Sequence, residues 1–252
     1  MNIAEVLGLP QLLQVKKIVC VEPHPDDNEV GAAGTLRELA LRGCEIVYIT
    51  VTDGRAGGSS RVPQTADIVQ IRKKERAEAG RIVGVSKQIA LDFPDMGDYT
   101  EQDLLAKLIP IIREERPDML LTVDPWMPYE AHPDHIKTGK AVAAAMLFSA
   151  NTFLYPDANP YTVPQIAFYA TAHPNTYIDV TPHWQRKIEA ILAHESQFGD
   201  AQWPMLQMYL EYHASQLYAT WKQATPGAEG YAEAFKVLTG QQLHFFPAAL
   251  HS

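Results

Sequence analysis

The sequence is poor in the features that mark disulfide-rich, secreted or membrane proteins. Only two of its 252 residues are cysteine, Cys20 and Cys44, and each sits at a predicted strand, so we expect two buried thiols and no disulfide framework. No run of about 18 apolar residues predicts a membrane span. Segment 1–17 contains Glu5 and Pro10 and lacks the charged start and long apolar core of a signal peptide. These absences predict a cytoplasmic protein.

The sequence also lacks an excess of positive charge and the glycine motifs of two large enzyme classes. Its formal net charge is −9 and it has no basic run, which argues against nucleic acid or an anionic membrane as the main partner. Gly31 and Gly34 do not complete G-x-G-x-x-G, so dinucleotide binding is not predicted. No G-x-S-x-G elbow presents a serine nucleophile.

What the sequence does contain is a regular alternation of strand and helix patterns. Short β-branched runs alternate with segments in which apolar residues recur at helical spacing. Such alternation predicts an α/β fold, with a Rossmann-like, mostly parallel sheet and helices on both faces. The predicted order is strand 17–22, helix 28–42, strand 45–52, helix 67–83, strand 88–91, helix 101–115, strand 119–123 and helix 136–150.

The C-terminal part is a less regular mixture of strands and helices, and no repeat or linker divides the chain. We therefore predict a single domain over residues 1–252. Loop 53–66 is polar and long for a compact domain, and such loops are usually functional or mobile. The elements expected after residue 150 are strands 165–171 and 176–181 and helices 181–195, 202–222 and 230–238.

Two turns rich in metal-ligand side chains follow strands of the predicted sheet. His24-Pro25-Asp26-Asp27 comes directly after strand 17–22, and His132-Pro133-Asp134-His135 follows strand 119–123 at a short distance. In a doubly wound sheet both turns lie at the same carboxyl edge, which is where such sheets bind ligands. The two turns together predict a metal site at this edge.

The ligand types within the two turns predict a catalytic zinc site. His24 and Asp27 are three residues apart at a helical turn and share a face, and His135 completes a set of two histidines and one carboxylate. Three protein ligands plus water is the arrangement of catalytic zinc, which lowers the pKa of that water to about 7. Such a water can attack an amide carbonyl at neutral pH.

Three further side chains of the turns have catalytic roles in this hypothesis. Asp26 adjoins a ligand but remains spare, so it is the natural general base. His132 is also spare and is expected to donate to the developing oxyanion, a role worth roughly 3 kcal/mol in other hydrolases. Asp134 is expected to hold His132 in the correct orientation.

Two other interpretations compete with a zinc site. Aspartate before a helix, as at Asp26 and Asp27, is often only an N-cap, and a His-Pro turn by itself is mostly a turn. His24-x-Asp26 with His135 also spells the facial triad of non-haem iron oxygenases. Those oxygenases tend to use all-β scaffolds, and capping alone does not require two ligand-rich turns after two strands, so we favour the metal hydrolase.

The two turns resemble those of the PIG-L/LmbE-like zinc de-N-acetylases. The hallmarks of that family stand here as PHPDD (Pro23 to Asp27) and HPDH (His132 to His135), and Arg72 and Glu75 match its Arg-x-x-Glu helix. The resemblance covers about residues 16–200. Within the family, VEPHPDD and DPWMPYEAHPDH are most similar to the diacetylchitobiose and N-acetylglucosamine deacetylases.

The resemblance implies roles for individual residues. It implies His24, Asp27 and His135 as zinc ligands, Asp26 as the base and His132 as the stabiliser of the transition state. It further implies that Arg72 and Asp95 reach the sugar. Beside the second turn, Trp126 is a candidate for stacking on a sugar face, and packing is the alternative. His244, in the aromatic tail, is a candidate for reaching a neighbouring subunit's site.

The implied activity is the zinc-dependent removal of acetyl from an N-acetylglucosamine-containing sugar, with release of acetate. The alternatives are an amidase acting on a thiol-glucosamine conjugate or another small amide, and a metal-dependent sugar-binding module without activity. One departure bears on the substrate, because many relatives have a Thr-x-Gly-Glu loop where this chain has Thr52-Asp53-Gly54-Arg55. The expected partners are a small amino sugar and further copies of the chain, since members of the family are often oligomers.

Overall fold

The fold is built on one sheet whose strands come from both ends of the chain. The computed structural model describes residues 3–60, 62–63, 65–223 and 229–252, so that Arg61 and Gln64 of the predicted loop 53–66 lie outside it. The described residues form a seven-stranded sheet in the order β3-β2-β1-β4-β5-β7-β6. Its strands are β1 Lys17–Glu22, β2 Glu45–Thr52, β3 Lys87–Phe93, β4 Met119–Val123, β5 Gln165–Tyr169, β6 Thr176–Asp179 and β7 Ala232–Thr239.

The sheet is parallel except for one strand. Within it, β1 pairs in parallel with β2 and β4, β2 with β3, and β4 with β5. Strand β7 runs antiparallel to both of its neighbours, β5 and β6. The prediction of a Rossmann-like, mostly parallel α/β sheet is confirmed.

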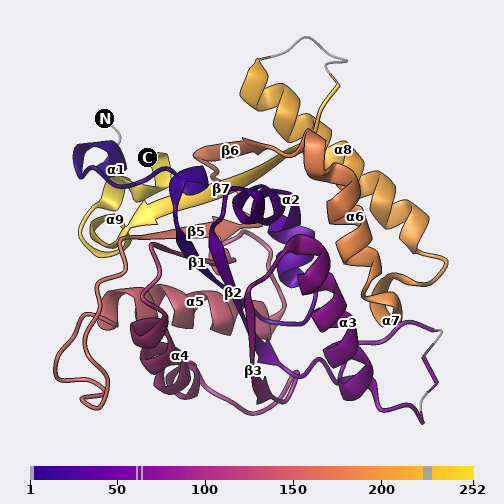
Figure 1. Cartoon of the computed structure of the whole chain (residues 1–252), viewed down its shortest axis with the longest axis horizontal. Coiled ribbons are helices and arrows are strands. Elements are labelled where there is room, and N and C mark those ends of the chain that lie inside the picture. The colour runs from indigo at the N-terminus through magenta and orange to yellow at the C-terminus, as the bar shows by residue number, and fades with distance from the viewer. Residues whose placement is uncertain (1–2, 61, 64, 224–228) are drawn as a thin grey trace.

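Helices cover both faces of the sheet, because successive strand side chains point to opposite faces and both sets are apolar (Figure 1). Val19, Val21 and Val47 pack on the side of α4 and α5, whereas Ile18 and Ile46 pack on the side of α2 and α6. The helices are α1 Ile3–Val6, α2 Asp27–Leu41, α3 Ile68–Val83, α4 Glu101–Glu115, α5 Pro133–Phe148, α6 Trp184–Leu192, α7 Glu195–Phe198, α8 Trp203–Lys222 and α9 Gly240–His244, with short 3-10 turns at Leu12–Gln14, Thr181–His183 and Pro247–His251.

The predicted helix at 230–238 is wrong, because Ala232–Thr239 forms strand β7. This strand lies inside the sheet, where Gln165 of β5 pairs with Thr239, and Phe235 is completely buried. Alanine, glutamate and lysine in the segment favour a helix by propensity, but tertiary burial overrides a preference of less than about 1 kcal/mol per residue.

The buried carboxylate of Glu233 explains why this strand tolerates charge. It accepts hydrogen bonds from the N–H groups of Gly34 (3.0 Å) and Thr35 (2.8 Å) in α2, and from Nζ of Lys187 in α6 (2.6 Å). Every partner is distant in the sequence, so the polar residue looks like part of a solvent-exposed helix face when the sequence is read alone. The contacts fasten β7 to two helices of one face of the sheet.

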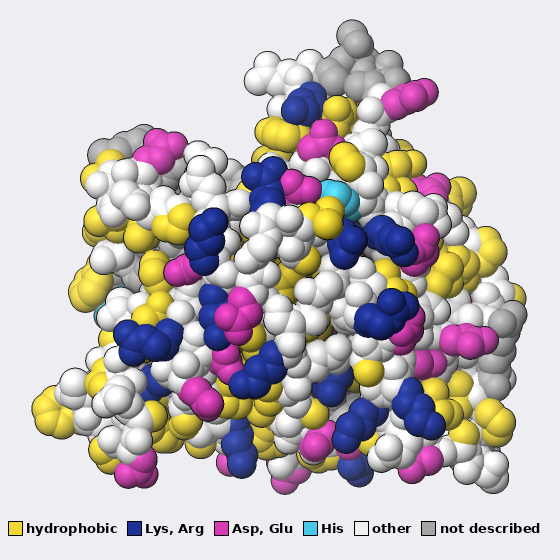
Figure 2. Space-filling model, viewed as in Figure 1, with side chains coloured by type: hydrophobic (Ala, Val, Ile, Leu, Met, Phe, Trp, Pro, Cys, Tyr) yellow, Lys and Arg dark blue, Asp and Glu magenta, His cyan; other side chains and the backbone are white. Residues whose placement is uncertain are grey.

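The carboxyl ends of the parallel strands open on one edge of the sheet, and both ligand-rich turns lie there. The first turn joins β1 to α2, and the second precedes and begins α5. On the face shown in Figure 2, Lys and Arg side chains are interspersed with Asp and Glu. Among the described residues no helix combines the length and the apolar character needed to cross a membrane.

Candidate metal and catalytic site

The predicted metal ligands His24, Asp27 and His135 converge on one point. Nδ1 of His24 lies 3.2 Å from Oδ2 of Asp27, and Nε2 of His135 lies 3.4 Å from Oδ1 of the same carboxylate. The backbone N–H of His24 donates to Oδ2 of Asp27 (2.8 Å), which fixes the turn. One ligand atom from each of the three residues lies within 4.8 Å of the others, and the rings of His24 and His135 are 5.3 Å apart.

This arrangement fits a metal ion. Ligands held tetrahedrally at about 2.0–2.1 Å from an ion lie about 3.3 Å from each other, which matches the two contacts of Asp27. The remaining ring nitrogens face carboxylates, since Nε2 of His24 is 3.3 Å from Oδ1 of Asp95 and Nδ1 of His135 is 3.1 Å from Oε2 of Glu130. Carboxylates behind the distal ring nitrogen are the usual support of metal-binding histidines.

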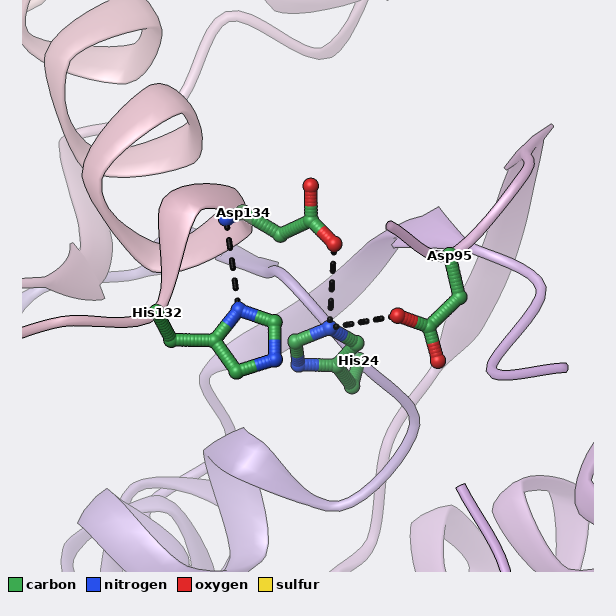
Figure 3. Close-up of side chains that lie close together, drawn as sticks. All are labelled: His24, Asp95, His132 and Asp134. Atoms are coloured by element: carbon green, nitrogen blue, oxygen red, sulfur yellow. Dashed lines mark hydrogen bonds and ion pairs between the residues drawn. The ribbon is translucent and has the colours of Figure 1, made fainter. Parts of the chain in front are cut away.

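A second group of ligand-type side chains shares His24 with the first. One atom from each of His24, Asp95, His132 and Asp134 also lies within 4.8 Å of the others (Figure 3). However, Nδ1 of His132 accepts the backbone N–H of Asp134 (3.3 Å), so a neutral ring carries its proton on Nε2 and has no free lone pair. The first group is therefore the better metal site.

The carboxylate of Asp134 has partners other than His132. It accepts from the hydroxyl of Tyr99 (2.7 Å) and the N–H of Met96 (2.9 Å), and Nζ of Lys137 lies 3.0 Å away. Burial raises the pKa of Asp134, but these donors outweigh burial and lower it to about 2. The predicted contact with His132 is thus made by the backbone of Asp134, and the carboxylate lies 3.5 Å from Nε2 of His24 instead.

The electrostatics of the first group favour positive charge. Burial lowers the pKa of His24, but its contacts with the carboxylates of Asp27 and Asp95 outweigh burial and raise the pKa to about 10. Asp27 shows the complementary effect: burial raises its pKa, and the bonds to His135 and His24 bring it far below the ordinary value. Protons and metal ions compete for such a site, so the same field that holds protons attracts a divalent cation.

Asp26 belongs to neither ligand group and does not cap the helix. It stands at the N-cap position of α2 with φ 139°, yet its side chain makes no capping hydrogen bond. Its Oδ2 accepts instead from Nη2 of Arg72 (2.9 Å). Burial raises the pKa of Asp26 to about 6, although Arg72 opposes the shift. Its position outside the ligand groups also argues against the iron facial triad, which requires Asp26 as a ligand.

Arg72 reaches this turn from α3 and is almost completely buried, with 3% exposure. Besides Asp26, its guanidinium donates to the carbonyl oxygens of Pro25 (2.8 Å) and Gly54 (3.1 Å). It therefore joins the β1 turn to the loop after β2. The family resemblance implied a sugar contact for Arg72, and the structure adds that Arg72 holds the aspartate expected to act as the base.

A cavity of about 310 Å³ adjoins these side chains. Trp126 does not line it: its ring packs edge-on against Phe168, and the residue as a whole is 55% exposed. His244 lies exposed on α9 and does not line it either. The described residues that line the cavity are His24, Asp26, Ala56, Gly57, Arg72, Asp95, Met96, His132 and Gln197.

Two residues of the site, Glu130 and Gln197, were not predicted from the sequence. Glu130 accepts the backbone N–H of His132 (2.8 Å) through Oε1 and contacts His135 through Oε2, so it braces both histidines of the second turn. The signal for it was present, because a carboxylate two residues before a ligand turn is well placed to support it. No local signal marks Gln197, which is distant from every motif in the chain.

A comparison with known proteins defines the class. The family model PIG-L, described as GlcNAc-PI de-N-acetylase, matches residues 19–146, and these contain both ligand turns and Arg72. The chain belongs to the PIG-L family, and it is therefore grouped with deacetylases, hydrolases that act on amide bonds.

Individual relatives extend the similarity over nearly the whole chain. Diacetylchitobiose deacetylase of Thermococcus kodakarensis is 35% identical, over 93% of this chain and 88% of that protein. The structure of N,N'-diacetylchitobiose deacetylase from Pyrococcus horikoshii aligns with a TM-score of 0.88 at 32% identity, covering 97% of this chain and 92% of the other. Mycothiol S-conjugate amidase of Streptomyces coelicolor is 30% identical, but over 56% of this chain and 55% of that protein.

Proposed function

We propose that the protein is a zinc-dependent hydrolase that removes the acetyl group from an N-acetylglucosamine unit of a small sugar, releasing acetate and the free amine. The observation that supports this most directly is the convergence of His24, Asp27 and His135 beside a cavity with Asp26 and His132 in its wall. Relatives named for diacetylchitobiose are similar over nearly the full length of the chain.

In this proposal His24, Asp27 and His135 hold the zinc ion. When bound, zinc supplies a Lewis acid for the amide carbonyl and acidifies the attacking water. Asp95 and Glu130 hold the two imidazoles from behind through their distal nitrogens. Supporting carboxylates of this kind typically change the metal affinity by about 10–100-fold. Asp95 and Glu130 are therefore part of the site, although neither binds the ion.

Asp26 acts as the general base. A carboxylate with a pKa of about 6 is ionised at neutral pH and is still basic enough to take a proton from the attacking water. Arg72 keeps this carboxylate oriented, while its two bonds to backbone carbonyls keep the guanidinium in place. Asp26 then returns the proton to the departing nitrogen, since the C–N bond breaks only if the amine leaves protonated.

His132 stabilises the negative charge that develops on the carbonyl oxygen. Burial and the nearby charges of His24 and His135 lower the pKa of His132, so the ring is neutral at physiological pH. With Nδ1 accepting from the backbone of Asp134, the proton lies on Nε2. A neutral, fixed N–H donor in the cavity wall is the element that an oxyanion requires.

The cavity volume of about 310 Å³ is at the lower end of the range for small-ligand pockets, which suits a single sugar unit at the reacting position. The test offers zinc-loaded protein N-acetylglucosamine, diacetylchitobiose and a thiol-glucosamine conjugate side by side, and measures the free glucosamine amine from all three and acetate from the first two. We expect acetate from the first two. Cleavage of the conjugate alone would transfer the proposal to the amidase, and metal binding without turnover of any substrate would favour a binding module.

A further inference from the structure

One wall of the cavity comes from a part of the chain that the family model does not include. Among the described lining residues, Gln197 is the only one outside residues 19–146. It belongs to the short helix α7, which lies in the C-terminal half of the chain. The other lining residues come from the β1 turn, the loops after β2 and β3, helix α3 and the second ligand turn.

Helix α7 is fastened to the site at two places. The carboxylate of Glu75 accepts both the backbone N–H of Ser196 (2.7 Å) and its hydroxyl (2.6 Å). The carbonyl oxygen of Ser196 accepts the N–H of Ser59, in the loop after β2 (2.7 Å). Glu75 is one turn from Arg72 on α3, so a single helix positions both the base and this wall of the cavity.

The carboxamide of Gln197 is held by one hydrogen bond and keeps hydrogen-bonding groups that no described residue engages. Its Nε2 donates to the hydroxyl of Ser196 (2.9 Å). Oε1 of Gln197 accepts no hydrogen bond from any residue that the structure describes, and the second N–H of its amide donates to none of these residues. One polar group is therefore held in a fixed direction with both an acceptor and a donor left for a ligand.

The backbone at Gly57 packs closely against this carboxamide and against the guanidinium of Arg72. A Cβ at position 57 would lie 2.7 Å from Oε1 of Gln197 and 2.4 Å from Nη1 of Arg72, so any side chain there would displace one or both groups. The glycine therefore lets the loop after β2 lie against both side chains, and all three residues line the cavity.

From this geometry we propose that Gln197 is a specificity-determining residue that hydrogen-bonds one hydroxyl of the amino sugar, with Ser196 and Glu75 as its positioning residues. The inference rests on the proposed deacetylation. A carboxamide both donates and accepts, which matches a hydroxyl group in either orientation. Because Gln197 lies outside the matched family segment, it offers a way for members with the same two ligand turns to select different sugars.

The test uses zinc-loaded full-length Gln197→Ala with N-acetylglucosamine and with analogues that each lack one hydroxyl. A lost neutral hydrogen bond made equally in the ground and transition states raises KM by about 10-fold and changes kcat by less than about twofold. Wild type should discriminate against one analogue by a similar factor, and the variant should not. Gln185→Ala, an exposed glutamine of α6, is the matched control and should behave as wild type.

Ser196→Ala keeps Gln197 but removes the hydroxyl that orients it, and should give a smaller loss of the same discrimination. If Gln197→Ala retains the wild-type preference against every analogue, the assignment is wrong, even if its overall activity falls. Zinc content measured alongside separates this outcome from damage to the site. Failure of wild type to release acetate from any amino sugar would instead refute the proposed function.

Discussion

Replacing Asp26 with asparagine should move activity and stability in opposite directions. Asparagine has the shape of the protonated acid and can still accept from Nη2 of Arg72, so the zinc ligands should stay in place. Without a base, kcat for acetate release should fall by about 10²–10⁴-fold at pH 8 while zinc remains stoichiometric. The matched control is Asp67→Asn, an exposed N-cap of α3, which should retain wild-type turnover.

The stability change follows from the burial of Asp26. Its pKa of about 6, against an ordinary 3.8, means that the folded protein binds this proton more tightly than the unfolded chain. Ionisation of Asp26 therefore disfavours folding. The penalty develops between about pH 3.8 and pH 6 and reaches about 3 kcal/mol above that range, at about 1.4 kcal/mol per unit of pKa difference. The penalty is absent below the unfolded pKa, where both states are protonated.

Urea unfolding of metal-free wild type and Asp26→Asn measures this difference. We expect the variant to be the more stable protein at pH 8 by about 2–3 kcal/mol, and the two to converge near pH 4. A residue that costs stability and supports turnover is the pattern expected of a functional group. Undiminished kcat, or a variant less stable than wild type at pH 8, would refute the role given to this carboxylate.

Two further changes test the supports of the site and of the sheet. Glu130→Gln should weaken zinc binding by about 10–100-fold in a chelator competition, because the amide holds His135 less strongly than the carboxylate does. An unchanged zinc affinity would show that Glu130 does not support the metal site. Glu115→Gln should cost about 0.5–1 kcal/mol at pH 7, because Lys17 and Lys87 contact Glu115 at 2.6 Å. Burial raises the pKa of Glu115, but the two lysines outweigh burial and lower it, so this stability is present above pH 4.5 and is lost as the pH falls through the folded value. A deficit that persists in acid would contradict this assignment.

The sequence was sufficient to predict the parallel part of the sheet. Strands β1 and β2 are runs rich in β-branched residues, β4 is a short apolar run, and each is bounded by turns. Strand β7 was missed because Glu233 is buried in it, and the partners that make this burial possible lie in α2 and α6, far away in the sequence. The local pattern of apolar and polar residues cannot show that a charged residue is buried by such distant contacts.

The site, like the sheet, has one part that could be predicted from the sequence and one part that could not. The convergence of His24, Asp27 and His135 could be predicted because one turn directly follows β1 and the other follows β4 at a short distance, and parallel topology then brings the two turns to one edge. The orientation of side chains within the turns could not be predicted. The carboxylate of Asp134 lies towards His24 and not His132, because Tyr99 and Met96 hold it there from the loop after β3.

The most direct test of the account is the position of zinc in crystals of the loaded protein, located by its anomalous scattering. We predict one peak about 2.0–2.2 Å from Nδ1 of His24, a carboxylate oxygen of Asp27 and Nε2 of His135, with Asp26 outside bonding distance. A zinc peak bonded to Nε2 of His24 together with Asp95 and Asp134 (Figure 3) would contradict this assignment.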